Sequence, residues 1–148
     1  MEMILFVGVQ ATGKSSFYRD RFFNTHVRIN LDMLKTRNRE RILLEACLAA
    51  RQRFVVDNTN LTAADRAAYV GTAKQAGFAV IGYYFQSRIA ECLARNATRC
   101  ESERVPDRAV LDAYGRLEIP SYEEGFDRLH YVTVDRQQLL VEEWRDEV

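Results

Sequence analysis

The 148-residue sequence predicts an α/β protein with a parallel β-sheet covered by helices on both faces. Two observations carry this prediction. Short apolar runs, typical of buried strands, alternate with segments of helical periodicity along the whole chain. Directly after the first apolar run, residues 8–15 spell G-x-x-x-x-G-K-S, a pattern that binds phosphate between a strand and a helix. No linker or repeat divides the chain, so we expect one domain over residues 1–148.

The first half of the chain predicts two strands and two helices in alternation. The apolar residues 3–7 form the first strand, and a helix follows the phosphate-binding pattern to about Phe23. The second strand covers residues 27–30, and the next helix runs roughly from Asn38 to Ala50. Its apolar positions share one face, and they are Leu43, Cys47 and Ala50.

The middle of the chain continues the alternation. Residues 53–57 form the third predicted strand. The next helix begins at Thr62, whose hydroxyl can cap it together with Asp65, and it stops at Gly77, a typical terminating glycine. The fourth strand covers residues 78–85.

The last third predicts a helix capped by Ser87, a charged connection and a second helix that starts at Pro106. The apolar face of the first helix passes through Ile89, Leu93 and Asn96, and that of the second through Val110, Tyr114 and Leu117. Residues 131–134 form a fifth strand, and we expect a polar C-terminal helix to end the chain.

Composition excludes several classes of protein. Hydrophobic residues make up 47% and charged residues 28%, the balance of a soluble globular domain. No apolar stretch approaches the roughly 18 residues of a membrane span, so we expect a cytoplasmic protein with no membrane partner. The formal net charge of zero argues against tight, sequence-independent binding of nucleic acid, although a local basic patch remains open.

The cysteines and histidines do not predict a metal site or a disulfide. Cys47, Cys92 and Cys100 lack C-x-x-C spacing, and an odd number without a secretion signal favours free thiols. We expect the first two in the core and Cys100 exposed. His26 and His130 each precede an apolar run and are interpreted as strand-edge residues.

The phosphate-binding pattern predicts a P-loop NTPase fold, with ATP and Mg²⁺ as ligands. Gly8 and Gly13 let the backbone curl around phosphates, Lys14 supplies a cation to the β- and γ-phosphates, and Ser15 places its hydroxyl on the magnesium ion. The predicted nucleotide-binding residues of this loop are Gly8, Val9, Gln10, Ala11, Thr12, Gly13, Lys14, Ser15 and Ser16.

Two carboxylates follow predicted strands and therefore lie at the edge of the sheet where ligands bind. Asp32 comes just after the second strand, where it can accept the proton of an attacking hydroxyl. Asp57 ends the third strand, where it can organise magnesium-bound water or hold the loop after the second strand. Aspartate is also common in structural turns, an interpretation that stays open above all for Asp57.

A basic run at residues 35–41 has two interpretations. Composition alone favours a solvated helix start, whereas its position after Asp32 favours the entrance of a phosphoryl acceptor, lined by Lys35, Arg37 and Arg39. The residues assigned to the acceptor are Lys35, Arg37, Asp57, Asn58 and Asn60.

Arg95 and Arg99 share a helix face at the start of a polar connection. We interpret residues 95–117 as a small lid that brings arginine to the triphosphate and excludes water. The alternative is a helix C-terminus that attracts cations through its dipole.

Five segments together resemble the kinase module of polynucleotide 5′-hydroxyl kinases, in the same order and at similar spacing. They are Gly8–Ser15, Asn30–Asp32, Val56–Asn60, Arg95–Arg99 and Val105–Pro106. The similarity runs from about residue 3 to about residue 134. Zeta-toxin-like kinases and small-molecule kinases share the first two segments.

The resemblance implies a five-stranded parallel sheet in the order 2-3-1-4-5. It also implies Asp32 as the general base on the acceptor hydroxyl, and Arg99 as the lid arginine, with Arg95 as the second candidate. The acceptor it implies is the 5′-hydroxyl of a polynucleotide.

Three departures bear on the acceptor. Leu31 stands where such kinases often carry arginine, Lys35 replaces an arginine of the phage-type enzyme, and the loop lacks the usual Gly-x-Pro-Gly-x-Gly. Two alternatives therefore stay open: a kinase for a small metabolite or nucleotide-sugar, and an ATP-binding or ATPase protein without a transfer acceptor.

Overall fold

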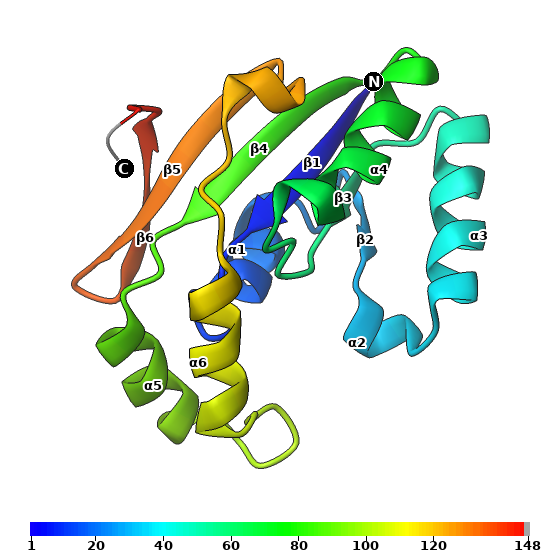
Figure 1. Ribbon diagram of the computed structural model, residues 1–148. Helices are drawn as coiled ribbons and strands as arrows, with labels where there is room; N and C mark the ends of the chain where they lie inside the picture. Colours follow the sequence, from blue (N-terminus) through cyan, green and yellow to red (C-terminus); the bar gives the residue numbers. More distant parts are fainter. Residues whose placement is uncertain (147–148) are drawn as a thin grey trace.

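The computed structural model describes residues 1–146 and has one six-stranded sheet in the order β2-β3-β1-β4-β5-β6 (Figure 1). The strands are β1 (Glu2–Val7), β2 (Val27–Ile29), β3 (Phe54–Val56), β4 (Ala79–Phe85), β5 (Arg128–Asp135) and β6 (Gln138–Glu143). The first five pair in parallel, which confirms the predicted order 2-3-1-4-5. The sixth pairs antiparallel with β5.

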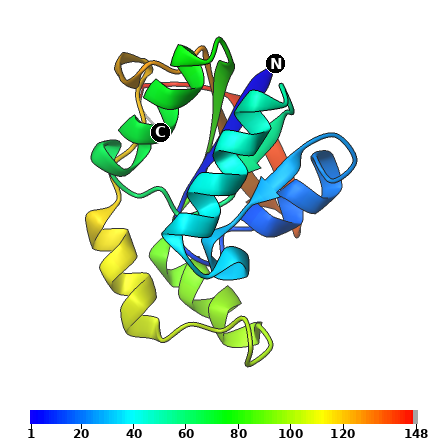
Figure 2. The same cartoon turned by 90° about the vertical axis from the view of Figure 1, so that its right-hand side faces the viewer.

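Helices cover both faces of the sheet, as predicted (Figures 1 and 2). They are α1 (Lys14–Arg21), α2 (Leu31–Leu34), α3 (Arg37–Ala49), α4 (Ala63–Gln75), α5 (Ile89–Thr98) and α6 (Asp107–Arg116), and a 3₁₀ turn covers Tyr122–Glu124. One face packs against α3 and α4, and the other against α1. The pair α5 and α6 lies beyond the end of the sheet in both views. None of the helices in residues 1–146 has the length and apolarity of a membrane span.

β1 is the central strand, and its continuous apolar sequence follows from burial on both faces. Met3 and Leu5 point into the core beneath α3 and α4. Ile4 and Phe6 point into the core beneath α1, where Phe6 packs edge-on against the Phe85 ring. The phosphate-binding loop therefore begins at the end of a strand that is buried on both faces.

A third apolar cluster joins the loop to the helices at the end of the sheet. Val9 is fully buried there against Cys92 of α5 and Val110 of α6. Cys47 and Cys92 are buried and Cys100 is exposed, all as predicted.

The predicted start and end of α4 are confirmed. Thr62 and Asp65 form the predicted capping box of α4, and Gly77 follows its end with a positive φ of 79°. Thr36, which the sequence analysis did not single out, caps α3 by accepting a hydrogen bond from the Arg39 amide. The four-residue α2 and the 3₁₀ turn were not predicted, because each is shorter than the window that periodicity needs.

The predicted cap of α5 is wrong. Ser87 accepts a hydrogen bond from the Val9 amide and donates one to the Phe85 carbonyl, so its hydroxyl holds the loop instead of the helix. The apolar face of α6 also differs from the prediction. Ala113 is buried and Tyr114 is half exposed, because α6 packs on α5 and Val9 through its smaller residues.

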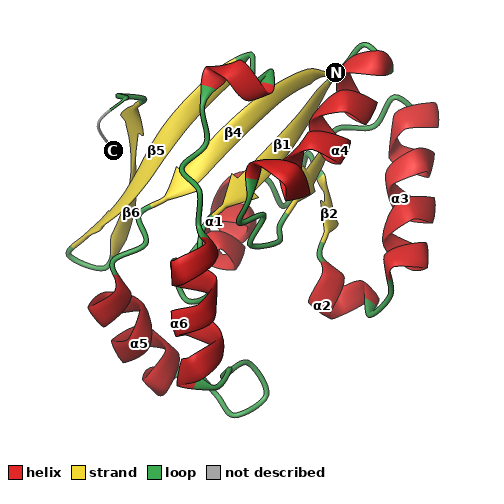
Figure 3. Cartoon of the chain, viewed as in Figure 1, coloured by secondary structure: helices red, strands yellow, loops and turns green. Residues whose placement is uncertain are grey.

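The expected C-terminal helix is also wrong. Residues 138–143 form β6, the edge strand of the sheet (Figure 3). Arg136 and Gln137 both have positive φ, as a two-residue hairpin turn requires. Leu139 and Val141 alternate toward α1, and their burial outweighs the helical propensity of the glutamate and leucine residues. Residues 147–148, which the expected helix would include, lie outside the described part.

An arginine buried in the core ties the segment between α6 and β5 to α4. Arg66 is fully buried and makes a two-pronged ion pair with Glu124, with N–O distances of 2.7 and 3.0 Å. Its remaining terminal nitrogen donates to the backbone carbonyls of Asn60, Leu61 and Glu118. The guanidinium thus satisfies three loop carbonyls that lie away from water.

Replacing Arg66 should therefore destabilise the fold far more than replacing an exposed cation on the same helix. Arg66→Met should lower the free energy of unfolding by about 3–5 kcal/mol, because Glu124 and three carbonyls lose their partner. Lys74→Met is the matched control, because Lys74 and its partner Asp127 are 42% and 47% exposed. It should cost less than about 1 kcal/mol. Urea denaturation measures both, and equal losses would contradict this assignment.

Candidate active site at the phosphate loop

The loop between β1 and α1 has the close contacts that its glycines allow. A Cβ at Gly8 would lie 3.1 Å from the Cβ of Phe85 and from the Thr12 hydroxyl. Gly13 has φ of 95°, and a Cβ there would lie 2.9 Å from Leu139 of β6. The unpredicted sixth strand therefore packs directly on the loop.

Ala11 takes a left-handed conformation with φ of 62°. A left-handed residue with a Cβ costs about 1–2 kcal/mol, so this loop is held in shape by its surroundings. One such contact is made by Arg95 of α5, which donates to the Ala11 carbonyl at 3.0 Å. The predicted lid and the loop are thus in direct contact.

Lys14 lies inside the loop, with its ammonium on loop oxygens. Its Nζ donates to the Val9 carbonyl at 2.6 Å and to the Thr12 hydroxyl at 3.4 Å. Burial lowers the pKa of Lys14 from 10.5 to about 8, against the opposing effects of nearby Asp57 and Asp32. Arg99 lowers the pKa further, so three of the predicted site residues act electrostatically on this ammonium.

Ser15 and Asp57 meet at the start of α1. The Ser15 hydroxyl donates to Asp57 Oδ2 at 3.1 Å, and Asp57 is only 2% exposed. Hydroxyl and carboxylate oxygens are the donors that Mg²⁺ prefers, so this Ser15–Asp57 pair fits a magnesium ion held together with nucleotide phosphates. No cluster of three or more His, Cys, Asp or Glu side chains able to hold a metal occurs in residues 1–146.

Arg28 of β2 also contacts this pair, and the sequence analysis missed it. Its Nε donates to Asp57 Oδ2 at 2.9 Å, and its Nη2 donates to the Ser15 hydroxyl at 2.9 Å. A single arginine within a three-residue strand carries no motif. The contact depends on the pairing of β2 with β3, which the sequence alone does not give.

The helix that bears Asp32 is fixed by two asparagines. Asn30 caps α2 by accepting from the Met33 amide, and its side-chain nitrogen donates to the Asp57 carbonyl at 2.6 Å. Asn58 accepts from the Leu31 amide at 2.8 Å. Asp32, the predicted general base, therefore lies on a short, doubly anchored helix.

The anchor continues through a buried acid. The side-chain nitrogen of Asn58 donates to Glu40 of α3 at 3.1 Å. Glu40 is 6% exposed and also accepts from the Tyr69 hydroxyl at 2.6 Å and from Arg37 at 3.1 Å. The position of α2 thus depends on α3 and α4 as well as on the sheet.

The structure separates the residues assigned to the acceptor. Lys35 is exposed at the end of α2, and Arg39 donates to the Leu34 carbonyl beside it. Arg37 is exposed, although its guanidinium is bonded to Glu40 and Tyr69. Asn60 is buried, with its side-chain nitrogen on the Phe6 carbonyl at 2.7 Å. Asn58 holds α2, and Asp57 lies with Ser15.

The lid segment has an internal tie that explains part of its sequence pattern. Asn96 is buried, and its amide donates to the Val105 carbonyl and accepts from the Val105 amide. The loop from Arg99 to Arg104 is closed by this pair. Arg99 ends α5 and is partly exposed, near enough to Lys14 to affect its pKa.

Gln10 and Ser16 are two further residues of the predicted nucleotide-binding loop. The Oε1 atom of Gln10 is buried and lacks a hydrogen-bond partner within residues 1–146. Ser16, at the first turn of α1, accepts a hydrogen bond from Arg19.

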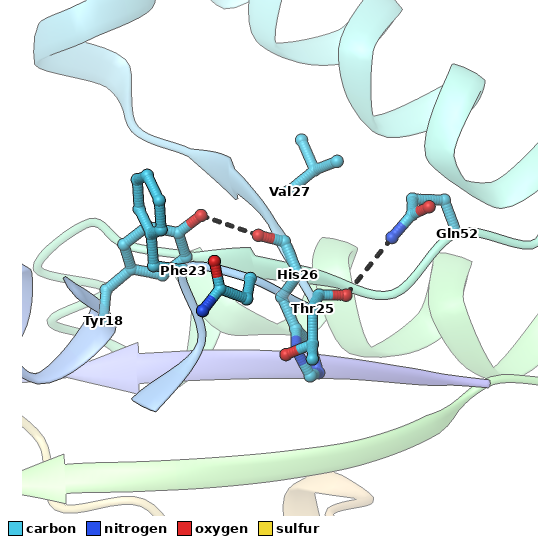
Figure 4. Close-up of a pocket in the computed structure, with 7 residues that line it drawn as sticks. Tyr18, Phe23, Thr25, His26, Val27 and Gln52 are labelled. Carbon is cyan, nitrogen blue, oxygen red and sulfur yellow. Dashed lines mark hydrogen bonds between the residues drawn. The ribbon is translucent and has the colours of Figure 1, made fainter. Parts of the chain in front are cut away.

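A hollow of about 420 Å³ lies near the opposite ends of the strands, between the turn before β2 and the residue Gln52 (Figure 4). The Tyr18 hydroxyl donates to the His26 carbonyl there, and Gln52 donates to the Thr25 carbonyl. The imidazole of His26 bonds to Glu2 and Thr25. These polar groups are satisfied within the fold, and the hollow is separate from the phosphate loop.

The comparisons with known sequences identify a P-loop domain, in agreement with the loop between β1 and α1. The family described as AAA domain matches residues 3–120, which is more than half of the chain, and the chain belongs to this family of P-loop proteins. It is 28% identical over 153 residues to an Acanthamoeba polyphaga mimivirus protein that carries the name bifunctional polynucleotide phosphatase/kinase. That alignment covers 97% of this chain and 36% of the relative.

A second relative and one solved structure are also similar to this chain. The bifunctional polynucleotide phosphatase/kinase of Schizosaccharomyces pombe is 29% identical over 138 residues, covering 88% of this chain and 33% of the relative. The chain thus spans about a third of the length of both relatives. A gluconokinase from Sinorhizobium meliloti 1021 superposes with a TM-score of 0.62 at 22% identity, covering 91% of this chain and 83% of that one. This last similarity concerns the fold.

Nucleotide binding should be coupled to proton uptake through Lys14. Burial holds its pKa at about 8 in the free protein, and polyphosphate raises that pKa by supplying negative charge. Between about pH 8 and pH 10 the neutral amine must therefore gain a proton on binding, and affinity should fall as pH rises.

Calorimetry of ADP binding at about pH 9, in two buffers of different ionisation enthalpy, measures this uptake. Lys14→Met should abolish the buffer dependence, and Lys35→Met, which removes an exposed lysine nearby, should leave it intact. A wild-type binding enthalpy that is equal in both buffers would contradict the assignment.

Proposed function

We propose that the chain is an ATP-dependent kinase that transfers the γ-phosphoryl group to the 5′-hydroxyl of a polynucleotide. The observation that best supports this proposal is that Asp32 and Arg99 both act on the pKa of Lys14, which favours convergence of the three residues at one end of the sheet. Such convergence provides a phosphate cradle, a proton acceptor and a mobile cation, the parts that phosphoryl transfer needs.

We assign one part of the transfer reaction to each of these groups. The acceptor oxygen attacks the γ-phosphorus, the bond from that phosphorus to the β-γ bridging oxygen breaks, and ADP leaves with that electron pair. Asp32 takes the proton of the acceptor hydroxyl. Lys14 moves from the Val9 carbonyl to the phosphates, and Arg99 neutralises charge on the transferring group. The Ser15–Asp57 pair would hold Mg²⁺, which would supply positive charge to the β- and γ-phosphates.

Two facts support a polynucleotide acceptor. The two curated relatives described above bear the names of polynucleotide phosphatase/kinases, and their similarity covers most of this chain. In addition, the exposed cations Lys35 and Arg39 lie at and just after the end of the helix that bears Asp32. Cations there can hold the backbone phosphates of a nucleic acid whose 5′ end reaches the base.

A small-molecule acceptor is the second candidate. It is favoured by the net charge of zero and by the similarity in fold to a gluconokinase. An ATPase without an acceptor is the third, and it leaves the exposed carboxylate of Asp32, on the anchored helix α2, without a role.

The acceptor is tested by incubating the protein with γ-³²P-labelled ATP and a panel of DNA and RNA oligonucleotides, sugars and nucleosides. Label should enter oligonucleotides with a 5′-hydroxyl and not those with a 5′-phosphate. Asp32→Asn should lower this transfer by about 10²- to 10⁴-fold, because the amide cannot accept the proton, while ADP affinity stays near that of the wild type. Label found only in a sugar would favour the second candidate, and a loss below about tenfold would remove Asp32 from the role of base.

The two lid arginines should separate in the same assay. Arg99→Ala should lower kcat by about 10³-fold with little change in ADP affinity, because its cation acts on charge that develops during transfer. Arg95→Ala should act mainly on ground-state binding, since Arg95 already bonds the Ala11 carbonyl of the loop. Arg99→Lys should restore part of the rate. The opposite pattern would assign the lid role to Arg95.

A further inference from the structure

We propose that Arg28, which donates hydrogen bonds to both Ser15 and Asp57, competes with a divalent cation for this pair. This inference rests on the proposed function, because it presumes that nucleotide and metal bind at the phosphate loop. It assigns to Arg28 a positioning role that no sequence motif indicates.

Arg28 donates hydrogen bonds to the same side-chain oxygens of Ser15 and Asp57 that would bind the metal. Asp57 Oδ2 accepts from both the Ser15 hydroxyl and Arg28 Nε, at 3.1 and 2.9 Å. The Ser15 oxygen gives its proton to Asp57 and accepts from Arg28 Nη2 at 2.9 Å. A hydroxyl has two lone pairs, and it coordinates a cation through one of them. Arg28 therefore already uses one lone pair on the oxygen that would coordinate magnesium.

The negative charge of the buried Asp57 carboxylate also favours competition between Arg28 and a metal ion. Asp57 is 2% exposed, and an unpaired carboxylate at that depth is strongly unfavourable. Arg28 pairs with this carboxylate at 2.9 Å, and the Lys14 ammonium adds a second positive charge nearby. When a divalent ion binds the Ser15–Asp57 pair, two positive centres would face the same carboxylate at short range and repel each other.

The Arg28 side chain can move away from the Ser15–Asp57 pair. Its side chain is 28% exposed, on β2 at the edge of the sheet, and it lies over the Tyr18 ring at 5.9 Å. The guanidinium can therefore move into solvent without opening the core. Asp57 cannot follow it, because the Asp57 amide and carbonyl are bonded to Ile29 and Asn30.

The test measures metal binding and stability, and it needs no acceptor. Mn²⁺ is titrated into the protein saturated with ADP, and free Mn²⁺ is followed by its paramagnetic resonance signal. Arg28→Gln should bind Mn²⁺ at least about fivefold more tightly than the wild type, because the competing cation is gone. Arg53→Gln is the matched control, since Arg53 is exposed just before β3 and carries the same charge. It should bind like the wild type.

Thermal unfolding distinguishes this role from a purely structural one. Without metal and nucleotide, Arg28→Gln should melt below the wild type, and saturating Mn²⁺ with ADP should close the gap. Arg28→Lys, which keeps a cation but lacks the two-pronged donor, should change Mn²⁺ affinity in the same direction by a smaller factor.

Three outcomes would overturn the proposal. Equal or weaker Mn²⁺ binding by both Arg28 variants would show that Arg28 does not compete. A stability gap that metal leaves unchanged would make Arg28 a structural residue. A wild-type protein that binds no Mn²⁺ with ADP would overturn the proposed function together with this inference, whereas the first two outcomes leave the proposed function intact.

Discussion

The arrangement of the site depends on the bonds made by Asp57. Its carboxylate accepts from Ser15 of α1 and Arg28 of β2, and its carbonyl accepts from Asn30, which caps the helix of Asp32. One residue thus joins the phosphate loop, the edge strand and the proposed base. Because Asp57 is buried at the end of β3, each of these bonds forms in a poorly solvated region where loss of a partner is costly.

The rest of the fold positions this residue. β1 and β3 are buried on both faces, so their carboxyl ends are fixed relative to each other. Asn58, the next residue along the chain, continues the network to Glu40 and Tyr69. The core, the helices and the site are therefore connected by hydrogen bonds that begin at a single strand end, which is the place where open parallel sheets bind ligands.

Much of this was predictable from local sequence. The run Met3–Val7 and the glycines at 8 and 13 predict strand, loop and helix because each needs only neighbouring residues. β6 was not predictable in this way, because its glutamate and leucine residues favour a helix. Only the pairing with β5, which local sequence does not show, makes this segment a strand. Arg28 was missed for the same reason. Its role requires two segments far apart in sequence to meet, and a single sequence does not show that register.

We propose that Lys14 and the Ser15–Asp57 pair receive a magnesium–nucleotide complex. A crystal structure of the protein with ADP and Mg²⁺ is the decisive test. In that structure Lys14 Nζ should leave the Val9 carbonyl for the β-phosphate, and the metal should lie beside the Ser15 hydroxyl with Arg28 displaced. A nucleotide bound elsewhere, with Lys14 still on the Val9 carbonyl, would refute the proposed site.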